Sequence, residues 1–495
     1  MPIAYMRISN MTAHTTHARL GVSMSAAAAA LVLTCALLTP AVAEEPTRPN
    51  ILYIVADDLG WKDVGFHGSD IRTPTLDALA AGGARLEQYY AEPMCTPTRA
   101  ALMTGRYPLR YGLQTGVIPQ GHTYGLATDE WLLPQALKDA GYETAIVGKW
   151  HLGHADPKFW PRQRGFDHQY GPLIGEIDYF THKVDEAVDW YRDNQVVVED
   201  GYSTTLLGDD AVKLVEGHDP SVPLFLYLAF NAVHTPYQAP QQYLDQYAAI
   251  EDPSRRAYAA SATAMDDQIG RVVAALDEKG MLDNTLIVFQ SDNGGVRDAL
   301  FAGAITDMST VVLPADNGPY RDGKGTVYEG GTRVVALASW PGHIQAGTTV
   351  NEMIHTVDMF PTLVTLAGGD TSRSKPLDGM DVWGTISEGK PSPRTEVVYN
   401  VEPQRAGVRE GDWKLVWKTM LPQSVELYNI AEDPSETKNL AAEHPDKVAD
   451  LERRANQLAA EAASPILLDI EIKKMLDGLH LPPSLPPTLD SLGAS

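Results

Sequence analysis

The chain has 495 residues, enough for one large α/β domain with a smaller appendage or for a few ordinary domains. Hydrophobic residues make up 44% of it and charged residues 21%, which is typical of a soluble globular protein with a sizeable core. Its 39 basic and 64 acidic residues give a net charge of -25, which argues against nucleic-acid binding. An anionic substrate must therefore be captured by a local group of positive charges.

Residues 1–43 are predicted to be a signal peptide. Basic residues precede the apolar stretch Ala26–Leu38, and the small residues at 41–43 fit a signal-peptidase site. The apolar stretch is shorter than the roughly 20 residues of a membrane-spanning helix, so we expect export without a remaining membrane anchor rather than an anchored protein. Removal of the leader takes Cys35 with it and leaves Cys95 alone. A lone exported thiol is either a buried apolar side chain or a reactive group.

From about Pro49 the pattern alternates between buried strands and amphipathic helices. Continuous apolar runs predict strands at 51–56, 144–147, 224–230, 286–289 and 334–337. Helical spacing and capping signals predict helices at 74–81, 132–140, 255–278 and 357–366. The alternation predicts an α/β domain over residues 49–390, with a large mostly parallel sheet between two layers of helices.

The character of the sequence changes near Pro391. Shorter strands rich in aromatic residues are predicted at 397–399, 413–417 and 427–428, and a helix is predicted at 444–462. These elements predict a small α+β subdomain with an antiparallel sheet over residues 391–480. The proline-rich end, residues 481–495, is predicted to be an extended tail.

Acidic and amide side chains directly follow two of the predicted strands. Asp57 and Asp58 come after the first strand, and Asp292 and Asn293 come after the fourth. Ligands of open α/β sheets bind at the carboxyl ends of the strands, and adjacent carboxylates need a positive charge nearby. Hard oxygen donors without histidine or thiolate favour Ca²⁺ or Mg²⁺. The alternatives are a helix-capping pair for the first dipeptide and an ordinary turn for the second.

Basic side chains follow two further strands. Lys149 and His151 come just after the second strand, and their two-residue spacing on an extended segment would put both side chains on one face. A lysine beside a histidine can hold an oxyanion and move a proton. His234 follows the third strand and is a candidate general acid, although a lone histidine is more often structural. Lys324 is, by its local sequence, an ordinary loop lysine.

Cys95 opens the segment Cys-Thr-Pro-Thr-Arg, a loop that runs into a predicted helix. The dipole at a helix N-terminus favours an anionic group, so a thiolate enzyme is one interpretation. The longer run CTPTRAALMTGRYPLRYGLQ resembles the signature of the formylglycine-dependent (type I) sulfatase family, in which this cysteine is oxidised to formylglycine. ADDLGWKDVGFHG, GKWHLG, SDNGG, GDWKL and ELYNIAEDPSETKNL are similar to other segments of the family, from about Asn50 to about Leu440. GEIDYF, PLFLYLAF and PLDGMDVWGTISEGKPSPR resemble its arylsulfatase B (N-acetylgalactosamine-4-sulfatase) branch in particular.

The resemblance implies an alkaline-phosphatase-like sandwich fold and hydrolysis of sulfate esters, on sulfated sugars or aryl sulfates. It also implies one Ca²⁺ per chain. In the family this ion is held by an oxygen of the formylglycine hydrate, here from Cys95, and by the residues that match Asp57, Asp58, Asp292 and Asn293.

The resemblance further implies a role for each basic residue. Arg99 would steady the hydrate, and Lys149 and Lys324 would bind sulfate oxygens. His234, alone or together with Lys324, would protonate the leaving oxygen, and His151 would take the proton that drives sulfate release. The expected partners are a small or terminal sulfated substrate and, during maturation, a formylglycine-generating enzyme.

Two features depart from the family pattern. The stretch 296–319 is longer than the corresponding region of the arylsulfatase B type, so sugar specificity cannot be carried over from that branch. The near-absence of cysteine removes the disulfides of animal relatives, which fits a bacterial exported enzyme, periplasmic or secreted.

Other functions remain open at this point. A phosphonate or phosphate ester hydrolase of the same superfamily can share the formylglycine and metal layout. A non-catalytic binder of sulfated carbohydrate could keep an unmodified cysteine, although it would not require the full set of charged site residues. A cysteine hydrolase lacks an evident His/Asp pairing near Cys95.

Overall fold

The computed structural model describes residues 48–298, 313–419 and 422–478. The predicted signal peptide with Cys35, the whole of the predicted tail and residues 299–312 of the long stretch lie outside the described residues. Within the described ranges, no helix is long and apolar enough to cross a membrane.

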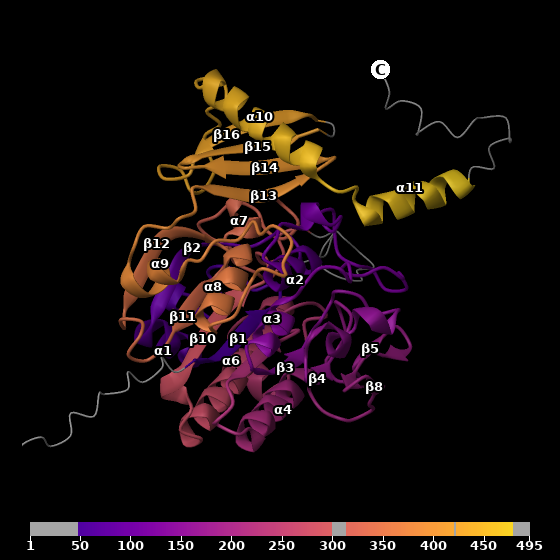
Figure 1. The fold of residues 1–495 in the computed structure, drawn as a ribbon, viewed down its shortest axis with the longest axis vertical. Helices are drawn as coiled ribbons and strands as arrows, with labels where there is room; N and C mark the ends of the chain where they lie inside the picture. Colours follow the sequence, from indigo (N-terminus) through magenta and orange to yellow (C-terminus); the bar gives the residue numbers. More distant parts are fainter. Residues whose placement is uncertain (1–47, 299–312, 420–421, 479–495) are drawn as a thin grey trace, which may run out of the picture. The chain divides into compact units, whose positions relative to one another are not determined.

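A ten-stranded mixed sheet forms the centre of the fold (Figure 1). From one edge to the other its strands are β12 (Thr348–His355), β2 (Ala84–Tyr90), β11 (Ala336–Ser339), β10 (Thr285–Ser291), β1 (Asn50–Ala56), β9 (Leu224–Ala229), β3 (Glu143–Gly148), β4 (His168–Gly171), β7 (Tyr191–Arg192) and β8 (Gln195–Val196). The central strands β10, β1, β9 and β3 run parallel and are almost entirely buried, as strands covered on both faces must be. The predicted parallel core is confirmed.

Antiparallel pairs flank the parallel core on both sides, although the edge strand β12 pairs parallel with β2. β11 pairs antiparallel with β10 and β2, and β7 pairs antiparallel with β4. The strand predicted at 334–337 begins two residues later, at Ala336, although the Val334 N–H still bonds to the Tyr89 carbonyl oxygen of β2. A separate two-stranded hairpin consists of β5 (Lys183–Val184) and β6 (Ala187–Val188).

Helices cover both faces of the large sheet (Figure 1). Those over one face are α1 (Pro74–Gly82), α4 (Ser203–Gly217), α5 (Gln241–Leu244) and α6 (Pro253–Glu278), and those over the other are α2 (Cys95–Thr104), α3 (Leu133–Asp139), α8 (Met359–Leu366) and α9 (Trp383–Glu388). Leu52 and Ile54 of β1 pack in the first of these two cores, and Ile51 and Tyr53 pack in the second, because alternate side chains of a strand point to opposite faces. The four predicted helices are confirmed to within two residues at each end.

An antiparallel sheet follows, as predicted, but it has four strands where three were predicted. It consists of β13 (Glu396–Glu402), β14 (Arg405–Glu410), β15 (Trp413–Lys418) and β16 (Ser424–Asn429). The helix α10 (Pro445–Glu461) lies across this sheet and buries Leu451, Ala455 and Leu458 against it, and α11 (Ile466–Gly478) comes next (Figure 1). A domain boundary at residue 391 stays a prediction.

Candidate active site

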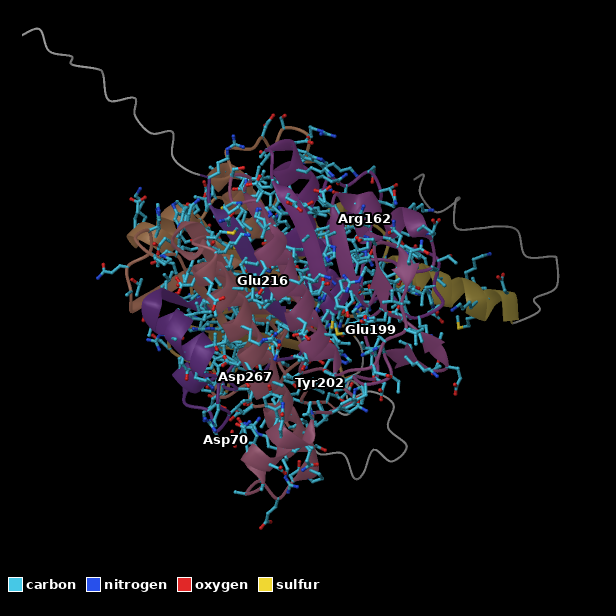
Figure 2. All side chains as sticks on the ribbon, turned by 90° about the horizontal axis from the view of Figure 1, so that it is seen from below. Asp70, Arg162, Glu199, Tyr202, Glu216 and Asp267 are labelled. Carbon is cyan, nitrogen blue, oxygen red and sulfur yellow. The ribbon has the colours of Figure 1, made fainter. Side chains whose placement is uncertain are left out.

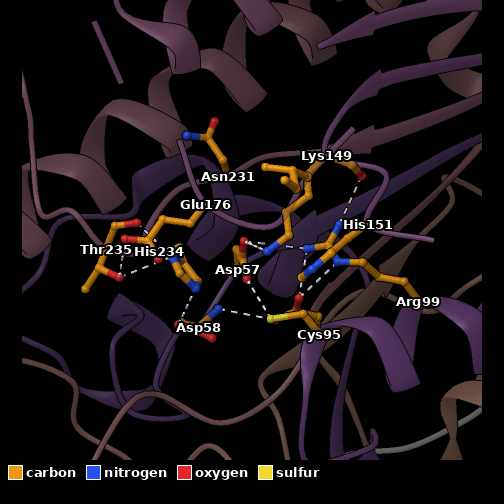
Figure 3. Close-up of polar contacts among 12 residues, drawn as sticks. Asp57, Asp58, Cys95, Arg99, Lys149, His151, Glu176, Asn231, His234 and Thr235 are labelled. Atoms are coloured by element: carbon orange, nitrogen blue, oxygen red, sulfur yellow. Dashed lines mark hydrogen bonds and ion pairs between the residues drawn. The ribbon is translucent and has the colours of Figure 1, made fainter. Parts of the chain in front are cut away.

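The predicted site residues meet at the carboxyl ends of the four central strands (Figure 3). Two other segments add to them, the first turns of α2 and the loop before α7 (Glu329–Thr332). The residues, by their origin, are Asp57 and Asp58 after β1, Asp292 and Asn293 after β10, Lys149 and His151 after β3, His234 after β9, Cys95 and Arg99 in α2, and Lys324 before α7. All ten are buried, so the strand-end arrangement expected from the sequence is present.

Cys95 is the first residue of α2, which therefore begins at the cysteine itself rather than after it. Its side chain is 1% exposed, and Sγ lies 3.4 Å from Oδ1 of Asp57. Burial raises the pKa of the thiol well above its usual value, and the Asp292 carboxylate raises it further, against the effect of Lys149 and Lys324. Because only a thiolate is strongly nucleophilic, this environment argues against an ordinary cysteine hydrolase.

Two carboxylate oxygens, the Cys95 sulfur and a ring nitrogen of His234 lie close enough together to share one cation. The side chains of Asp57, Asp58, Cys95 and His234 each offer one ligand atom, and these atoms lie within 4.8 Å of one another. None of the four is more than 8% exposed.

Asp292 and Asn293 adjoin this group through Asp58. The Asp58 N–H donates to Oδ1 of Asp292 at 3.2 Å, and Nδ2 of Asn293 donates to Oδ1 of Asp58 at 2.7 Å. The buried Oδ1 of Asn293 has no hydrogen-bond partner among the described residues. An unpaired buried oxygen costs about 1–3 kcal/mol, and a cation ligated there would remove that cost. The donor set therefore fits a hard divalent cation such as Ca²⁺ or Mg²⁺.

Three buried cations balance the three buried carboxylates. The pairs are Lys149 with Asp57, Arg99 with Asp292 at 2.8 Å, and Lys324 with Asp58 at 2.8 Å. Burial alone would raise the pKa of Asp57, but the charges of Lys149, His234 and Arg99 lower it below its usual value. For Asp292, burial and the Asp57 charge outweigh Arg99 and raise the pKa. Buried charges of this kind are tolerated only when they are paired, so the six side chains depend on one another.

His151 differs from its predicted geometry. Its φ of 58° lies in the left-handed region, so the segment from Lys149 to His151 is not extended, and the prediction of an extended segment is wrong. Hydrogen bonds from its N–H to the Leu173 carbonyl oxygen and from Trp150 N–H to the Pro172 carbonyl oxygen hold this turn, and the imidazole still reaches the site. Burial and the Lys149 charge lower the pKa of His151 well below its usual value. Its buried Nδ1 has no hydrogen-bond partner in the described ranges, so the neutral ring can accept a proton there.

His234 is held by its neighbour. Its Nδ1 lies 2.7 Å from the Thr235 carbonyl oxygen, so Nδ1 donates to that oxygen, and its Nε2 lies 3.5 Å from Oδ2 of Asp58 (Figure 3). The ring therefore presents Nε2 toward the buried charges, where a proton can be held and transferred.

A cavity of about 380 Å³ opens above these groups. It is lined by Cys95, His151, His234 and Lys324 and also by Met94, Val117, Ile118, Pro119, Gln120, Ile174, Gly175, Glu176 and Val184. The second set was not expected as site residues, because no residue in it belongs to a strand-end motif. Glu176 lies within the segment GEIDYF, which resembles the arylsulfatase B branch but carries no strand-end signal.

The tripeptide Asp-Asn-Gly occurs a second time, at residues 316–318, in a loop that supports the site. The Asn317 side chain accepts a hydrogen bond from Gly295 N–H and donates to the Gly295 and Asp322 carbonyl oxygens. It therefore fixes the turn that follows Asp292 and Asn293. Asn317 is buried, with an exposed fraction of 3%, and the tripeptide sequence alone does not predict this burial.

Two family models and several known proteins are similar to this chain. The family model described as Sulfatase matches residues 49–369, and the model described as N-sulphoglucosamine sulphohydrolase, C-terminal, matches residues 320–461. Arylsulfatase J of Mus musculus is 39% identical over 392 residues, which are 77% of this chain and 63% of that protein. N-acetylgalactosamine-6-sulfatase of Mus musculus is 35% identical over 75% of this chain and 73% of that protein.

Among solved structures, Ps i-CgsB in complex with k-i-k-neocarrahexaose is similar with a TM-score of 0.78 and 32% identity. The match covers 88% of this chain and 98% of that chain. The narrower likeness to the arylsulfatase B type stays a prediction. The chain belongs to the sulfatase family of sulfuric ester hydrolases.

Proposed function

We propose that this chain hydrolyses sulfate esters of sugars, with Cys95 converted to formylglycine as the nucleophile. The observation that carries the proposal is the position of Cys95, buried at the start of α2 where three cations, three carboxylates and two histidines converge. An unmodified thiol in this environment stays protonated, whereas a hydrated aldehyde supplies a hydroxyl nucleophile and a second hydroxyl through which sulfate can leave.

Asp57, Asp58, Asp292 and Asn293 would hold one Ca²⁺ beside the modified Cys95. When bound, the ion supplies positive charge that stabilises the negative charge developing during sulfate transfer. The unpaired Oδ1 of Asn293 supports this assignment, since the ligand set is incomplete without a cation.

The basic residues take separate parts in the reaction. Lys324 lines the cavity and binds sulfate oxygens together with Lys149, which supplies locally the positive charge that the acidic chain lacks. Arg99 fixes Asp292 through two hydrogen bonds to Oδ2 and steadies the modified Cys95.

Two histidines move the protons. His234 donates from Nε2 to the leaving oxygen, and Nδ1 stays bonded to the Thr235 carbonyl oxygen. His151 accepts at Nδ1 the proton that accompanies sulfate release, because that atom has no other partner among the described residues.

A sugar substrate is supported by the names of the relatives. The family includes a protein named N-acetylgalactosamine-6-sulfatase, and Ps i-CgsB was crystallised with k-i-k-neocarrahexaose. The cavity of about 380 Å³ lies at the small end of the range of ligand sites, roughly 300–1,000 Å³, which favours a small or terminal sulfated group.

The protein is proposed to be exported, to the bacterial periplasm or the medium, after removal of residues 1–43. A formylglycine-generating enzyme is the proposed maturation partner. Because the Cys95 side chain is 1% exposed in the folded chain, that enzyme must act before folding is complete.

The test compares aryl sulfate with aryl phosphate and aryl phosphonate esters that carry the same leaving group. The proposal expects kcat/KM to be highest for the sulfate ester. Preference for a phosphorus ester would assign the chain to the phosphohydrolase alternative, and binding of sulfated sugars without any turnover would assign it to the non-catalytic one.

A further inference from the structure

The cavity above Cys95 contains one carboxylate that the proposed mechanism does not use. Among the described lining residues outside the metal-ligand group, Glu176 is the only acidic side chain. The charged or titratable groups that share the cavity with it are Lys324, His151 and His234, and the other walls are apolar apart from Gln120. Figure 3 shows Glu176 beside Thr235 and His234, at one edge of the reacting groups.

The segment that carries Glu176 is firmly positioned. The buried Asp189 carboxylate accepts a hydrogen bond from Ile174 N–H at 2.8 Å. Gly175 packs so closely on His151 that an added Cβ would lie 2.3 Å from Cε1 of its ring. The backbone just before Glu176 is therefore held in place, and the Glu176 side chain is only partly exposed.

The Glu176 carboxylate has spare hydrogen-bonding capacity. Its one hydrogen-bond partner in the described part of the chain is the Thr235 hydroxyl, at 3.5 Å, and no lysine, arginine or histidine there forms an ion pair with it. The carboxylates of Asp57, Asp58 and Asp292, in contrast, each have a cation at ion-pair distance. An ionised carboxylate can accept about four hydrogen bonds, so most of the capacity of Glu176 faces the cavity.

We propose that Glu176 determines substrate choice, an inference that rests on the proposed function. Its carboxylate accepts a hydrogen bond from a hydroxyl group of the sugar that bears the reacting sulfate. It also repels a second sulfate or a carboxylate at the same place, because among the described residues its negative charge forms no ion pair. The substrate class is therefore a sugar unit with one sulfate and neutral neighbouring positions, and the apolar walls formed by Val117, Ile118 and Ile174 fit the C–H face of such a ring.

The experiment uses the full mature chain with Cys95 shown to be converted. A set of positional monosulfated N-acetylhexosamines identifies the one that the wild type hydrolyses fastest. The same sugar with a second sulfate on the adjacent hydroxyl is then compared with it, and the measured quantity is the ratio of the two kcat/KM values. The comparison is made for wild type, for Glu176→Gln, and for Glu186→Gln, a control at the exposed turn between β5 and β6 that removes the same charge.

The wild type and Glu186→Gln should prefer the monosulfated sugar, and Glu176→Gln should lower that preference by about tenfold or more. An unchanged ratio in Glu176→Gln would overturn the inference and leave the proposed function standing. A wild type that prefers the disulfated sugar would overturn it as well, whatever the variants do. Failure of the wild type to hydrolyse any sulfate ester would overturn both proposals.

Discussion

The side chains around Cys95 form a balanced set of buried charges. Each carboxylate has its own cation, and the unpaired Oδ1 of Asn293 leaves one position open to a metal ion. Removing one partner of a buried ion pair lowers the free energy of unfolding by more than the intact pair contributes to it, because the remaining buried charge has no partner. Single changes here should therefore alter metal binding, activity and stability together.

The change Asp292→Asn tests this dependence. It keeps the shape of the side chain but removes one metal ligand charge and the partner of Arg99. We expect bound Ca²⁺, measured by elemental analysis, to fall well below one per chain and kcat/KM on an aryl sulfate to fall by about a hundredfold or more.

The exposed Asp277, near the end of α6, provides the matched control, and Asp277→Asn should keep both properties. Full activity of Asp292→Asn, or activity of the wild type that survives complete removal of metal by chelation, would contradict the metal assignment.

His234→Ala tests the proton donor. A general acid matters most when the leaving oxygen is a poor leaving group. The rate should therefore fall by about a hundredfold or more on a sugar sulfate and by much less on an activated phenyl sulfate. The exposed His343 gives the control His343→Ala, which should leave both rates unchanged. Equal losses on the two substrate types would contradict the acid role.

Among the individual residues of the site, those at the strand ends were predicted from the sequence, but the residues around them were not. Asp57, Asp292 and Lys149 follow recognisable apolar runs, so the sheet topology alone places them together. Lys324 entered only through the resemblance, and Glu176 was not expected in the site at all. Glu176 reaches the cavity because of the course that the segment after β4 takes. No local sequence pattern predicts that course.

The helix α7 connects the site to the antiparallel sheet. Gly294, next to Asn293, approaches α7 so closely that a Cβ would lie 1.8 Å from the Gly330 carbonyl oxygen. From the other side, Lys414 of β15 reaches Glu329 of α7 and the buried Glu436, both at 2.9 Å. The sheet β13–β16 therefore helps to fix the turn that carries a predicted metal ligand.

Lys414→Met tests this connection. The change leaves two buried carboxylates without their shared cation, so the free energy of unfolding should fall by about 3–5 kcal/mol. Urea unfolding measures it. Lys418→Met, on the same strand but with its ammonium partly exposed, should lower the free energy of unfolding by less than about 1 kcal/mol. Similar effects of the two changes would show that the buried cluster contributes no special stability.

Glu436 also predicts a pH dependence. Burial raises its pKa to about 7, against the effect of Lys414, so the folded chain binds a proton more tightly than the unfolded chain does. This contribution favours folding at low pH and is lost as the pH rises from about 4.5 to about 7. Relative to Glu436→Gln, the wild type should therefore lose free energy of unfolding over that interval. A difference that stays constant or grows with pH would contradict the assignment.

The elements that the sequence missed share a physical reason. β14 contains Gly407 and three charged side chains, and β7 and β8 have only two residues each. None of the three strands therefore gives an apolar run. Their strand conformation comes from pairing with neighbours that the local sequence does not reveal. The antiparallel direction of β11 likewise depends on the long connection before it, not on its own residues.

Over the whole molecule, acidic residues outnumber basic ones, whereas the two lysines assigned to sulfate binding are buried. Figure 2 labels three exposed acidic residues, Asp70, Glu216 and Asp267, whereas Lys149 and Lys324 are buried. With a net charge of -25, the chain as a whole repels an anionic substrate before the site can attract it.

Salt should therefore speed capture of a sulfated sugar. Raising the ionic strength from about 0.01 M to about 0.15 M shortens the Debye length from roughly 30 Å to roughly 8 Å and screens the distant acidic surface more than the buried site. We expect kcat/KM to rise over this interval while kcat at saturating substrate changes little. A steady fall in kcat/KM would mean that attraction of the substrate by the positive charges of the site outweighs its repulsion by the acidic surface.

The central claim is the conversion of Cys95, and mass spectrometry of the peptide that contains it tests this most directly. The protein is isolated from the exported fraction of a host that contains a formylglycine-generating enzyme, and the converted fraction is compared with the activity. We expect an aldehyde-containing peptide, turnover proportional to its fraction, and no turnover in Cys95→Ala. Full sulfatase activity in protein whose Cys95 is entirely unmodified would contradict it.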